Sequence, residues 1–406
     1  MTSFDSSSPQ INVWRMLLAL AVVFVMLATT GWTATRHGRE STALQASLSA
    51  WEQGSVGGHR LPDPDAGPAR LTRFFASLTV QQRDALARRY PLAVGNMNGA
   101  PPGLRYRANR VALAQAVHTE RDRMSDARLS RAGQQVAGKR MHRFESMLRG
   151  GRQILAFDPD GSGRAAEVFG DLDRAERISV IVPGVDTNLL TFQRTYRGYS
   201  APVGMAGSLY AAERAASPTT RTAVIAWADY TAPAGLGIDS ATAMRAEDGA
   251  VRLNALLRAL PGRAPVSLFC HSYGSVVCGV AAHDLPKRVA DIAVAGSPGM
   301  RVAKAEHLGT PARVWAMRDA TDWIQDVPYL EFGGLGHGAD PVSPAFGARV
   351  LSARDADGHA GYFAPGTDSL RNFADIGVGA YDAVRCADED GACRVGLSGA
   401  SMAGRA

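Results

Sequence analysis

The feature that most constrains the fold is a series of short apolar runs separated by segments with helical character. Val, Ile, Ala and Leu occupy successive positions in these runs, so both faces of each strand must be buried. Such strands, alternating with helices, predict a mostly parallel, doubly wound sheet with helices on both sides. We predict strands at 177–184, 222–230, 265–270, 291–299 and 312–319.

Polar residues follow three of these runs directly. The segments are "PGVD", "CHSYGS" and "MRDATD", each at the end of a predicted strand. The carboxyl ends of parallel strands lie along one edge of a sheet, and ligands bind there. We therefore expect a functional site at this edge.

The stretch "VSLFCHSYGSVVCGV" places a serine where an apolar strand turns into a helix. A tight strand–turn–helix of this kind lifts a serine hydroxyl above the sheet and frees the next backbone N–H. Small residues are needed two positions before and after the serine, and these are Cys270, in place of the usual glycine, and Gly274. The alternative is an ordinary helix N-cap serine. We expect Ser272 to be a nucleophile.

A serine nucleophile needs a histidine base and a carboxylate that orients the histidine. In this architecture the chain order is serine, acid, histidine, with the acid just after a later strand. Asp319, Asp322 and Asp326 all follow the last predicted strand. Asp319 is closest to the strand end, whereas Asp322 lies where its side chain could reach back to a histidine.

Two histidines remain downstream of these carboxylates. His337 lies in the glycine-rich "GGLGHGADP", and His359 lies in a loop ahead of the last helix-like segment. A loop before the last helix is the usual place for the base, so we favour His359 and keep His337 as the alternate. His271, next to the serine, is expected to pack against the turn.

Two backbone N–H groups are expected to stabilise an oxyanion. One is the N–H of Tyr273, and the other comes from the loop after the first core strand, where Val185 is the candidate. Gly184 would permit close approach there, and Asp186 could instead hydrogen-bond within the loop.

An uncharged apolar segment near the N-terminus is the clearest targeting signal. Residues 16–32 carry no charge, and with 33–35 they approach the roughly 20 residues needed to cross a bilayer. We expect an uncleaved transmembrane helix, with a cleaved secretory signal as the alternative. Arginines flank the segment on both sides and leave its orientation open. We expect the domain to be extracytoplasmic and attached to the cell membrane.

The rest of the chain divides by pattern. Apolar residues recur every three to four positions in "LRYRANRVALAQAVHTERDRM", which predicts helices before the α/β core. The expected organisation is a polar leader and anchor at 1–35, a juxtamembrane region and helical module at 36–150, the core at 151–385 and a C-terminal tail at 386–406.

Cysteine and charge usage exclude several classes. Four cysteines without CxxC spacing predict no metal site, and we expect no cofactor. Cys386 and Cys393 could close a local disulfide in an exported domain, whereas Cys270 and Cys278 are expected to be buried small residues. The net charge of +6 comes from arginines scattered among acidic residues, so we expect no nucleic-acid partner.

Seven motifs together resemble a known family. They are "LTVQQRDALARRYPLAVGNMNGAPPGLRYRANR", "VPGVDTN", "IAWADYTAP", "CHSYGS", "VAGSPG", "HGADP" and "HAGYF…SLRNFADIGVG". In this order, over residues 69–385, the chain resembles the actinobacterial α/β-hydrolase family known as DUF1023. The resemblance implies an α/β-hydrolase fold behind a helical leader, a nucleophile at Ser272 and a histidine at His359. The family's Asp before an apolar pair matches "DWI", which ranks Asp322 above Asp319.

These features predict a membrane-anchored serine hydrolase that cleaves a carboxylic ester, with a small-molecule, lipid or cell-envelope acyl group as substrate. The same acyl-enzyme could pass its acyl group to an alcohol, which would make the protein an acyltransferase. A different class remains as an alternative: an envelope binding or scaffold protein on a hydrolase fold that has lost catalysis.

Overall fold

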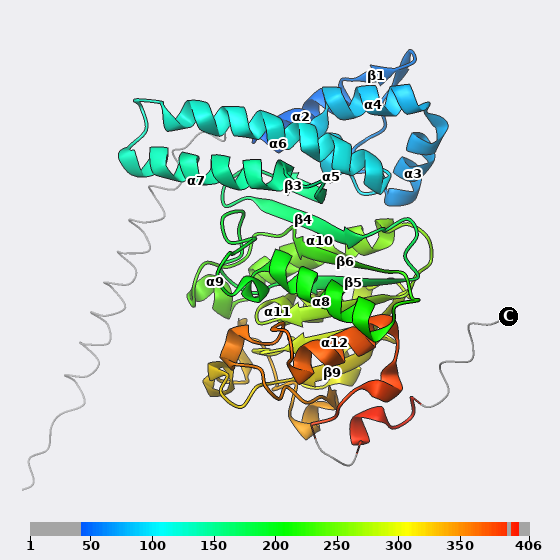
Figure 1. Cartoon of the computed structure of the whole chain (residues 1–406), viewed down its shortest axis with the longest axis vertical. Coiled ribbons are helices and arrows are strands. Elements are labelled where there is room, and N and C mark those ends of the chain that lie inside the picture. Colours follow the sequence, from blue (N-terminus) through cyan, green and yellow to red (C-terminus); the bar gives the residue numbers. More distant parts are fainter. Residues whose placement is uncertain (1–41, 388–390, 398–406) are drawn as a thin grey trace, which may run out of the picture.

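A computed structural model describes residues 42–387 and 391–397 of the chain (Figure 1). The transmembrane helix expected at 16–35 lies outside these residues. Within the described part, none of the helices combines the length and the apolar character needed to cross a bilayer.

The core is an eight-stranded sheet in the order β12-β9-β8-β7-β5-β6-β4-β3. All neighbouring strands are parallel except that β4 is antiparallel to both β3 and β6. The five predicted strands are confirmed as β5 to β9. The strands are β3 (Gln153–Asp158), β4 (Arg164–Gly170), β5 (Arg177–Val182), β6 (Thr222–Ala228), β7 (Val266–His271), β8 (Val289–Ala295), β9 (Arg313–Met317) and β12 (Arg349–Val350).

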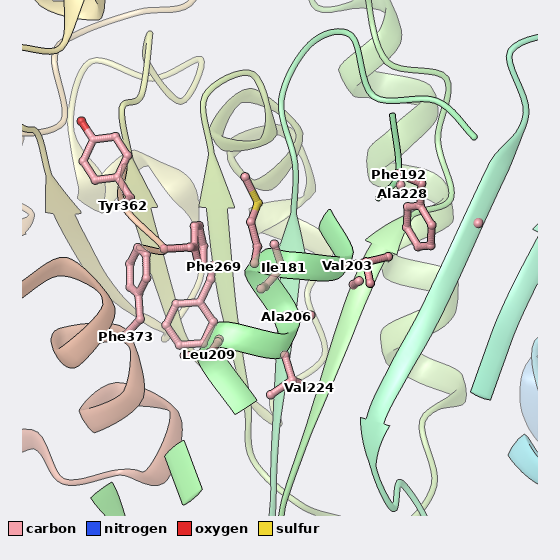
Figure 2. Packing of buried hydrophobic residues seen from close by; sticks show 14 of the residues in the cluster. Ile181, Phe192, Val203, Ala206, Leu209, Val224, Ala228, Phe269, Tyr362 and Phe373 are labelled. Atoms are coloured by element: carbon pink, nitrogen blue, oxygen red, sulfur yellow. The ribbon is translucent and has the colours of Figure 1, made fainter. Parts of the chain in front are cut away.

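Helices cover both faces of this sheet, as the apolar runs predict (Figure 1). Helices α8 (Pro202–Ala216) and α12 (Asp368–Val378) lie on one face, and α10 (Met244–Ala259) and α11 (Gly274–Ala281) lie on the other. Alternate residues of one strand therefore enter different cores. Phe269 packs with Leu209 and Phe373 on the first face (Figure 2), and Leu268 packs with Leu253 on the second.

A helical module precedes the sheet. It comprises α2 (Ala43–Glu52), the small hairpin of β1 (Ser55–Val56) and β2 (His59–Arg60), α3 (Pro68–Ser77), α4 (Val80–Arg89), α5 (Pro91–Asn96), α6 (Pro102–Met124) and α7 (Arg131–Leu148). Trp51 of α2 is buried in its core, with its ring 5.7 Å from that of Tyr90.

Helices α5 and α6 cover β3, which would otherwise be an open edge of the sheet. The Asn96 side chain accepts from the Phe157 N–H at 3.0 Å and donates to the Phe157 carbonyl at 2.7 Å. Asn109 donates to the Ile154 carbonyl at 2.9 Å. These amides supply the partners that another strand would provide, and they protect the edge from unwanted pairing.

Both pairs of cysteines form disulfides, Cys270–Cys278 and Cys386–Cys393. Cys270 and Cys278 are buried, as expected, but the expectation that they are not partners was wrong. Cys270 is near the end of β7 and Cys278 lies on α11, and the sharp turn between these elements brings their Cα atoms to 6.5 Å. The disulfide therefore links the strand before the serine to the helix after it.

Candidate active site

Ser272 lies at the tip of the turn between β7 and α11, with a positive φ of 55°. This left-handed backbone conformation is rare for a residue other than glycine. Its N–H donates to the Ala295 carbonyl at 3.0 Å, which fixes the turn against β8. A Cβ atom on Gly274 would lie only 2.1 Å from the Val182 carbonyl oxygen. Any larger residue would clash with the backbone of β5, which explains why a glycine is needed two positions after the serine.

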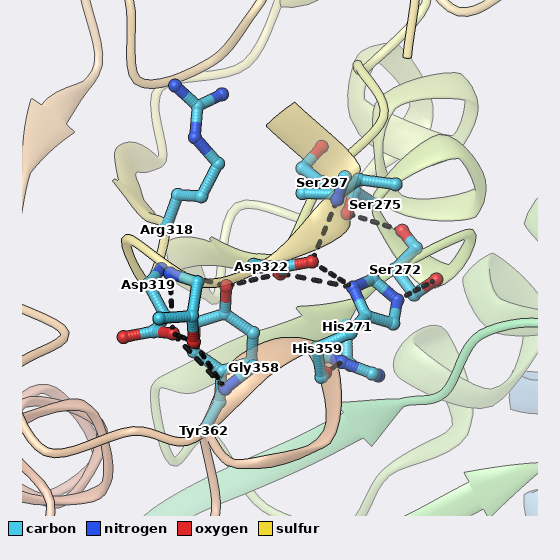
Figure 3. Close-up of polar contacts among 12 residues, drawn as sticks. His271, Ser272, Ser275, Ser297, Arg318, Asp319, Asp322, Gly358, His359 and Tyr362 are labelled. Carbon is cyan, nitrogen blue, oxygen red and sulfur yellow. Dashed lines mark hydrogen bonds and ion pairs between the residues drawn. The ribbon is translucent and has the colours of Figure 1, made fainter. Parts of the chain in front are cut away.

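The structure brings Ser272, His359 and Asp322 into one hydrogen-bonded line (Figure 3). The His359 Nε2 atom lies 2.9 Å from the Ser272 Oγ atom. The Nδ1 atom lies 2.8 Å and 3.0 Å from the two carboxylate oxygens of Asp322. Since a carboxylate only accepts, the imidazole N–H is on Nδ1, and Nε2 is free to accept the serine proton.

The Asp322 carboxylate is fully buried and held by three donors in all. Besides His359, the hydroxyl of Tyr362 donates to it at 2.5 Å and the N–H of Ile324 at 2.9 Å. Burial by itself would raise the pKa of Asp322, but the hydrogen bonds from His359, Tyr362 and Ile324 outweigh it and lower that pKa. Asp322 therefore stays ionised at neutral pH.

The two alternates take other positions. Asp319 accepts from the Thr321 hydroxyl at 2.5 Å and from the Gly358 N–H at 3.1 Å, so it anchors the loop before His359. His337 is directed through Nε2 at the Ser240 carbonyl, 2.7 Å away. Neither side chain has a hydrogen bond to Ser272 or His359 in the described part of the chain.

The loop after β5 passes directly beside the serine. A Cβ atom on Gly184 would lie 2.6 Å from Ser272 Cβ, so only glycine permits this approach. Within residues 42–387 and 391–397, the N–H groups of Val185 and Tyr273 donate to no other group. Val185 and Tyr273 line the same cavity as Ser272, and free backbone donors beside a serine hydroxyl are what an oxyanion hole requires.

Two contacts, one to the backbone of His359 and one to Asp322, were not anticipated from the sequence. His271 lies with its Nε2 atom 2.6 Å from the backbone carbonyl oxygen of His359, and the two rings are 4.9 Å apart. Burial lowers the pKa of His271 to about 3, so its ring is neutral and donates this bond. The other contact is Tyr362, whose place three residues after His359 in "HAGYF" was the one available signal.

A cavity of about 240 Å³ opens above Ser272. Its lining is mainly apolar, and the residues come from the loops after β5, β6, β8 and β9 and from the turn after β7. They include Leu236, Tyr273, Trp323, Ile324, Val327 and His337. A nucleophile at the base of an apolar cavity suits a substrate with a hydrocarbon group next to the reacting carbonyl.

Two solved structures with weak similarity to this chain are described as hydrolases. One is a putative α/β hydrolase of unknown function from Agrobacterium tumefaciens, with a TM-score of 0.28 and 10% identity, covering 43% of this chain and 72% of that one. The other is 2,6-dihydroxy-pseudo-oxynicotine hydrolase, with a TM-score of 0.37 and 13% identity. This match covers 86% of this chain and 92% of that one. TM-scores this low say nothing about the activity of this chain.

The curated relatives are uncharacterized mycobacterial proteins. Rv2079 of Mycobacterium tuberculosis is 28% identical over an alignment of 383 residues; the match covers 80% of this chain and 58% of the relative. Rv0963c of the same organism is 32% identical over an alignment of 203 residues; the match covers 47% of this chain and 74% of the relative. This chain thus spans little more than half of Rv2079. A family model described as an alpha/beta hydrolase matches residues 158–332. The chain belongs to the α/β-hydrolase family.

Proposed function

We propose that this protein hydrolyses carboxylic esters through an acyl-enzyme formed on Ser272. One observation carries the proposal: His359 lies between the Ser272 hydroxyl, at 2.9 Å, and the buried Asp322 carboxylate, at 2.8 Å. In this geometry one nitrogen can accept a proton while the other is held by a negative charge. A serine hydroxyl needs this arrangement to act as a nucleophile at neutral pH.

In the first half-reaction, the Ser272 Oγ atom attacks the ester carbonyl carbon and its proton passes to the His359 Nε2 atom. The carbonyl electron pair moves onto the carbonyl oxygen, where the N–H groups of Tyr273 and Val185 would stabilise it. The bond to the leaving alcohol then breaks, and the alcohol oxygen takes the proton from His359. Asp322 stabilises the imidazolium that forms between these steps.

In the second half-reaction, a water molecule loses a proton to His359 and attacks the acyl carbon. The bond between that carbon and Ser272 breaks, and the serine oxygen recovers its proton from His359. The apolar cavity would hold the acyl group during both steps.

We also propose that the domain works outside the cytoplasm and is attached to the membrane by the apolar segment at 16–35. The Cys270–Cys278 and Cys386–Cys393 disulfides support an oxidising compartment. Protease treatment of intact cells tests this topology. Digestion of the domain from outside is expected, and full protection in intact but not permeabilised cells would contradict it.

A fluorophosphonate probe and a series of nitrophenyl esters from acetyl to palmitoyl test the chemistry. The full-length wild type should be labelled and should turn over esters, and Ser272→Ala should lose both. Ser297→Ala is a matched control, because this buried serine near the site bonds to Gly299 rather than to His359. Labelling that persists in Ser272→Ala, or a wild type that neither labels nor turns over, would contradict the proposal.

A further inference from the structure

Exposed large apolar side chains gather on two segments beside the candidate active site. Leu236 and Ile238 come from the segment between β6 and α10, which contains α9 (Ile238–Ala241), and Met244 is the first residue of α10. Trp323, Leu330, Phe332 and Leu335 come from the segment after β9, which contains the hairpin of β10 (Glu331–Phe332) and β11 (Leu335–Gly336). Ile238 and Phe332 are 77% and 84% exposed. We call these seven side chains the apolar rim.

The two segments form one surface because they are joined directly. Thr242 and Leu335 pair as an isolated antiparallel bridge. The His337 Nε2 atom contacts the Ser240 carbonyl at 2.7 Å, and the Tyr273 hydroxyl donates to the Thr242 carbonyl at 2.8 Å. The bond from the Tyr273 hydroxyl also ties the rim to the residue that follows the nucleophile. His337, which the sequence offered as an alternate base, thus helps to hold the rim together.

The apolar rim is continuous with the cavity above the nucleophile. Leu236 and Trp323 belong to both, and Ser272 lines the same cavity. At about 240 Å³ this cavity is smaller than typical ligand pockets, which measure roughly 300–1,000 Å³. A long acyl chain would therefore extend beyond the cavity and lie against the rim.

Charge on the rim points to apolar contact as the basis of recognition. The Asp239 carboxylate pairs with Arg245 at 3.0 Å, and the Glu331 carboxylate pairs with Arg301 at 2.7 Å. Each pair cancels its own charge. Contiguous apolar surface of this kind marks an interaction site.

The position of the rim decides between the possible occupants. A second copy of the chain, or another protein, seated on Leu236 and Trp323 would cover the mouth of the cavity and close off Ser272. A lipid surface makes the same apolar contacts and delivers an acyl ester directly to the opening. We propose that the apolar rim docks on a lipid surface and that the substrate is an acyl ester drawn from it. This inference rests on the proposed esterase function, which it deepens.

Quenching of Trp323 by lipid tests the docking without any turnover. The full-length protein carrying Ser272→Ala is reconstituted in phosphatidylcholine vesicles with brominated acyl chains, which quench tryptophans that enter the lipid. The difference between this protein and the same protein with Trp323→Phe isolates the Trp323 signal from the other tryptophans. We expect strong quenching of this signal, because the rim places Trp323 against the acyl chains.

Variants of the rim locate the contact. Ile238→Ser and Phe332→Ser should each weaken the quenching of Trp323. With Ser272 restored, each should lower the ratio of palmitoyl-ester turnover in vesicles to acetyl-ester turnover in water by roughly tenfold. Val80→Ser and Val136→Ser change apolar side chains that are 56% and 45% exposed in the helical module, and they should change neither quantity.

Each possible result bears on one proposal at a time. Quenching without esterase activity in the wild type would retain the docking surface and contradict the proposed function. Esterase activity without quenching of Trp323 would overturn the docking alone. A dimer in light scattering that Phe332→Ser dissociates would show that the rim is an interface between copies. That result would also overturn the proposed docking on lipid.

Discussion

The ring of His271 donates a hydrogen bond to the backbone carbonyl of His359 at 2.6 Å, across 88 residues of sequence. The donor is adjacent to the candidate nucleophile, and the acceptor belongs to the candidate base. The bond therefore fixes the distance between the two groups that must exchange a proton. We regard His271 as a positioning residue, since it acts through the main chain of His359.

Removing this bond should lower kcat. His271→Leu lacks the donor, and a shift of the imidazole by about 1 Å costs on the order of 100-fold in rate. His271→Gln retains an N–H donor and should recover much of kcat. Measuring kcat and KM for both variants checks this: the loss should fall on kcat. Equal activity in the two variants would show that the bond does not position His359.

The same residue gives the protein a pH-dependent stability. Burial lowers the pKa of His271 to about 3, below its ordinary 6.5, so the unfolded chain binds a proton there that the folded chain excludes. Stability should therefore fall as the pH drops below 6.5, by about 2 kcal/mol at pH 5 from this group. Urea unfolding of wild type and His271→Gln at pH 7.5 and pH 5 measures this loss of stability. The free energy of unfolding should fall less in the variant than in wild type. An identical loss in both would contradict the assignment.

Tyr362 should act through Asp322. Its hydroxyl donates to the buried carboxylate at 2.5 Å, and hydrogen bonds to charged groups contribute about 1.5–3 kcal/mol. Tyr362→Phe should raise the pKa of Asp322 and reduce stability by that order at pH 7. The lowered pKa of Asp322 stabilises the fold only while the carboxylate is ionised. The stability difference between wild type and Tyr362→Phe should therefore shrink below about pH 4. Unfolding at pH 7 and pH 3.5 measures this difference, and a constant difference would contradict the role.

Two neighbouring carboxylates should differ sharply in their effect on rate. Asp322→Asn removes the negative charge at His359 Nδ1 and should lower kcat by about 10⁴-fold. Asp319→Asn is the matched control, because Asp319 contacts Gly358 and Thr321 instead of the imidazole. It should retain most of the turnover. Steady-state kinetics on a nitrophenyl ester separates the two, and a larger loss in Asp319→Asn would reverse the assignment.

The Cys270–Cys278 disulfide should stabilise the turn that carries Ser272. In the chain-entropy model, closing a loop of about nine residues contributes about 2–3 kcal/mol. The double variant Cys270→Ala/Cys278→Ala should lose about this much in urea unfolding and should also lose turnover. Cys386→Ala/Cys393→Ala removes the other disulfide, away from the serine, and should keep turnover. Full turnover without the first disulfide would show that the turn does not need it.

The sequence by itself determined the parallel sheet and the main residues of the candidate site. Apolar residues on both faces of the runs at β5 to β9 require a sheet covered on both sides, and this requirement is local to each run. Ser272 was found from the strand–turn–helix pattern, and His359 from its place before the last helix. The choice of Asp322 over Asp319 came from the family resemblance, because both aspartates follow β9 closely enough to reach a histidine.

Only the tertiary structure decided the further contacts around those residues. Whether Cys270 pairs with Cys278, and whether His271 meets the carbonyl of His359, depends on where loops from separate strands finally lie. The order of strands in the sequence predicts which segments reach the same edge of the sheet, but it does not give the individual contacts that the loops make there. The apolar rim has the same origin, because Thr242 and Leu335 become neighbours only when the loops after β6 and β9 close over the same edge of the sheet.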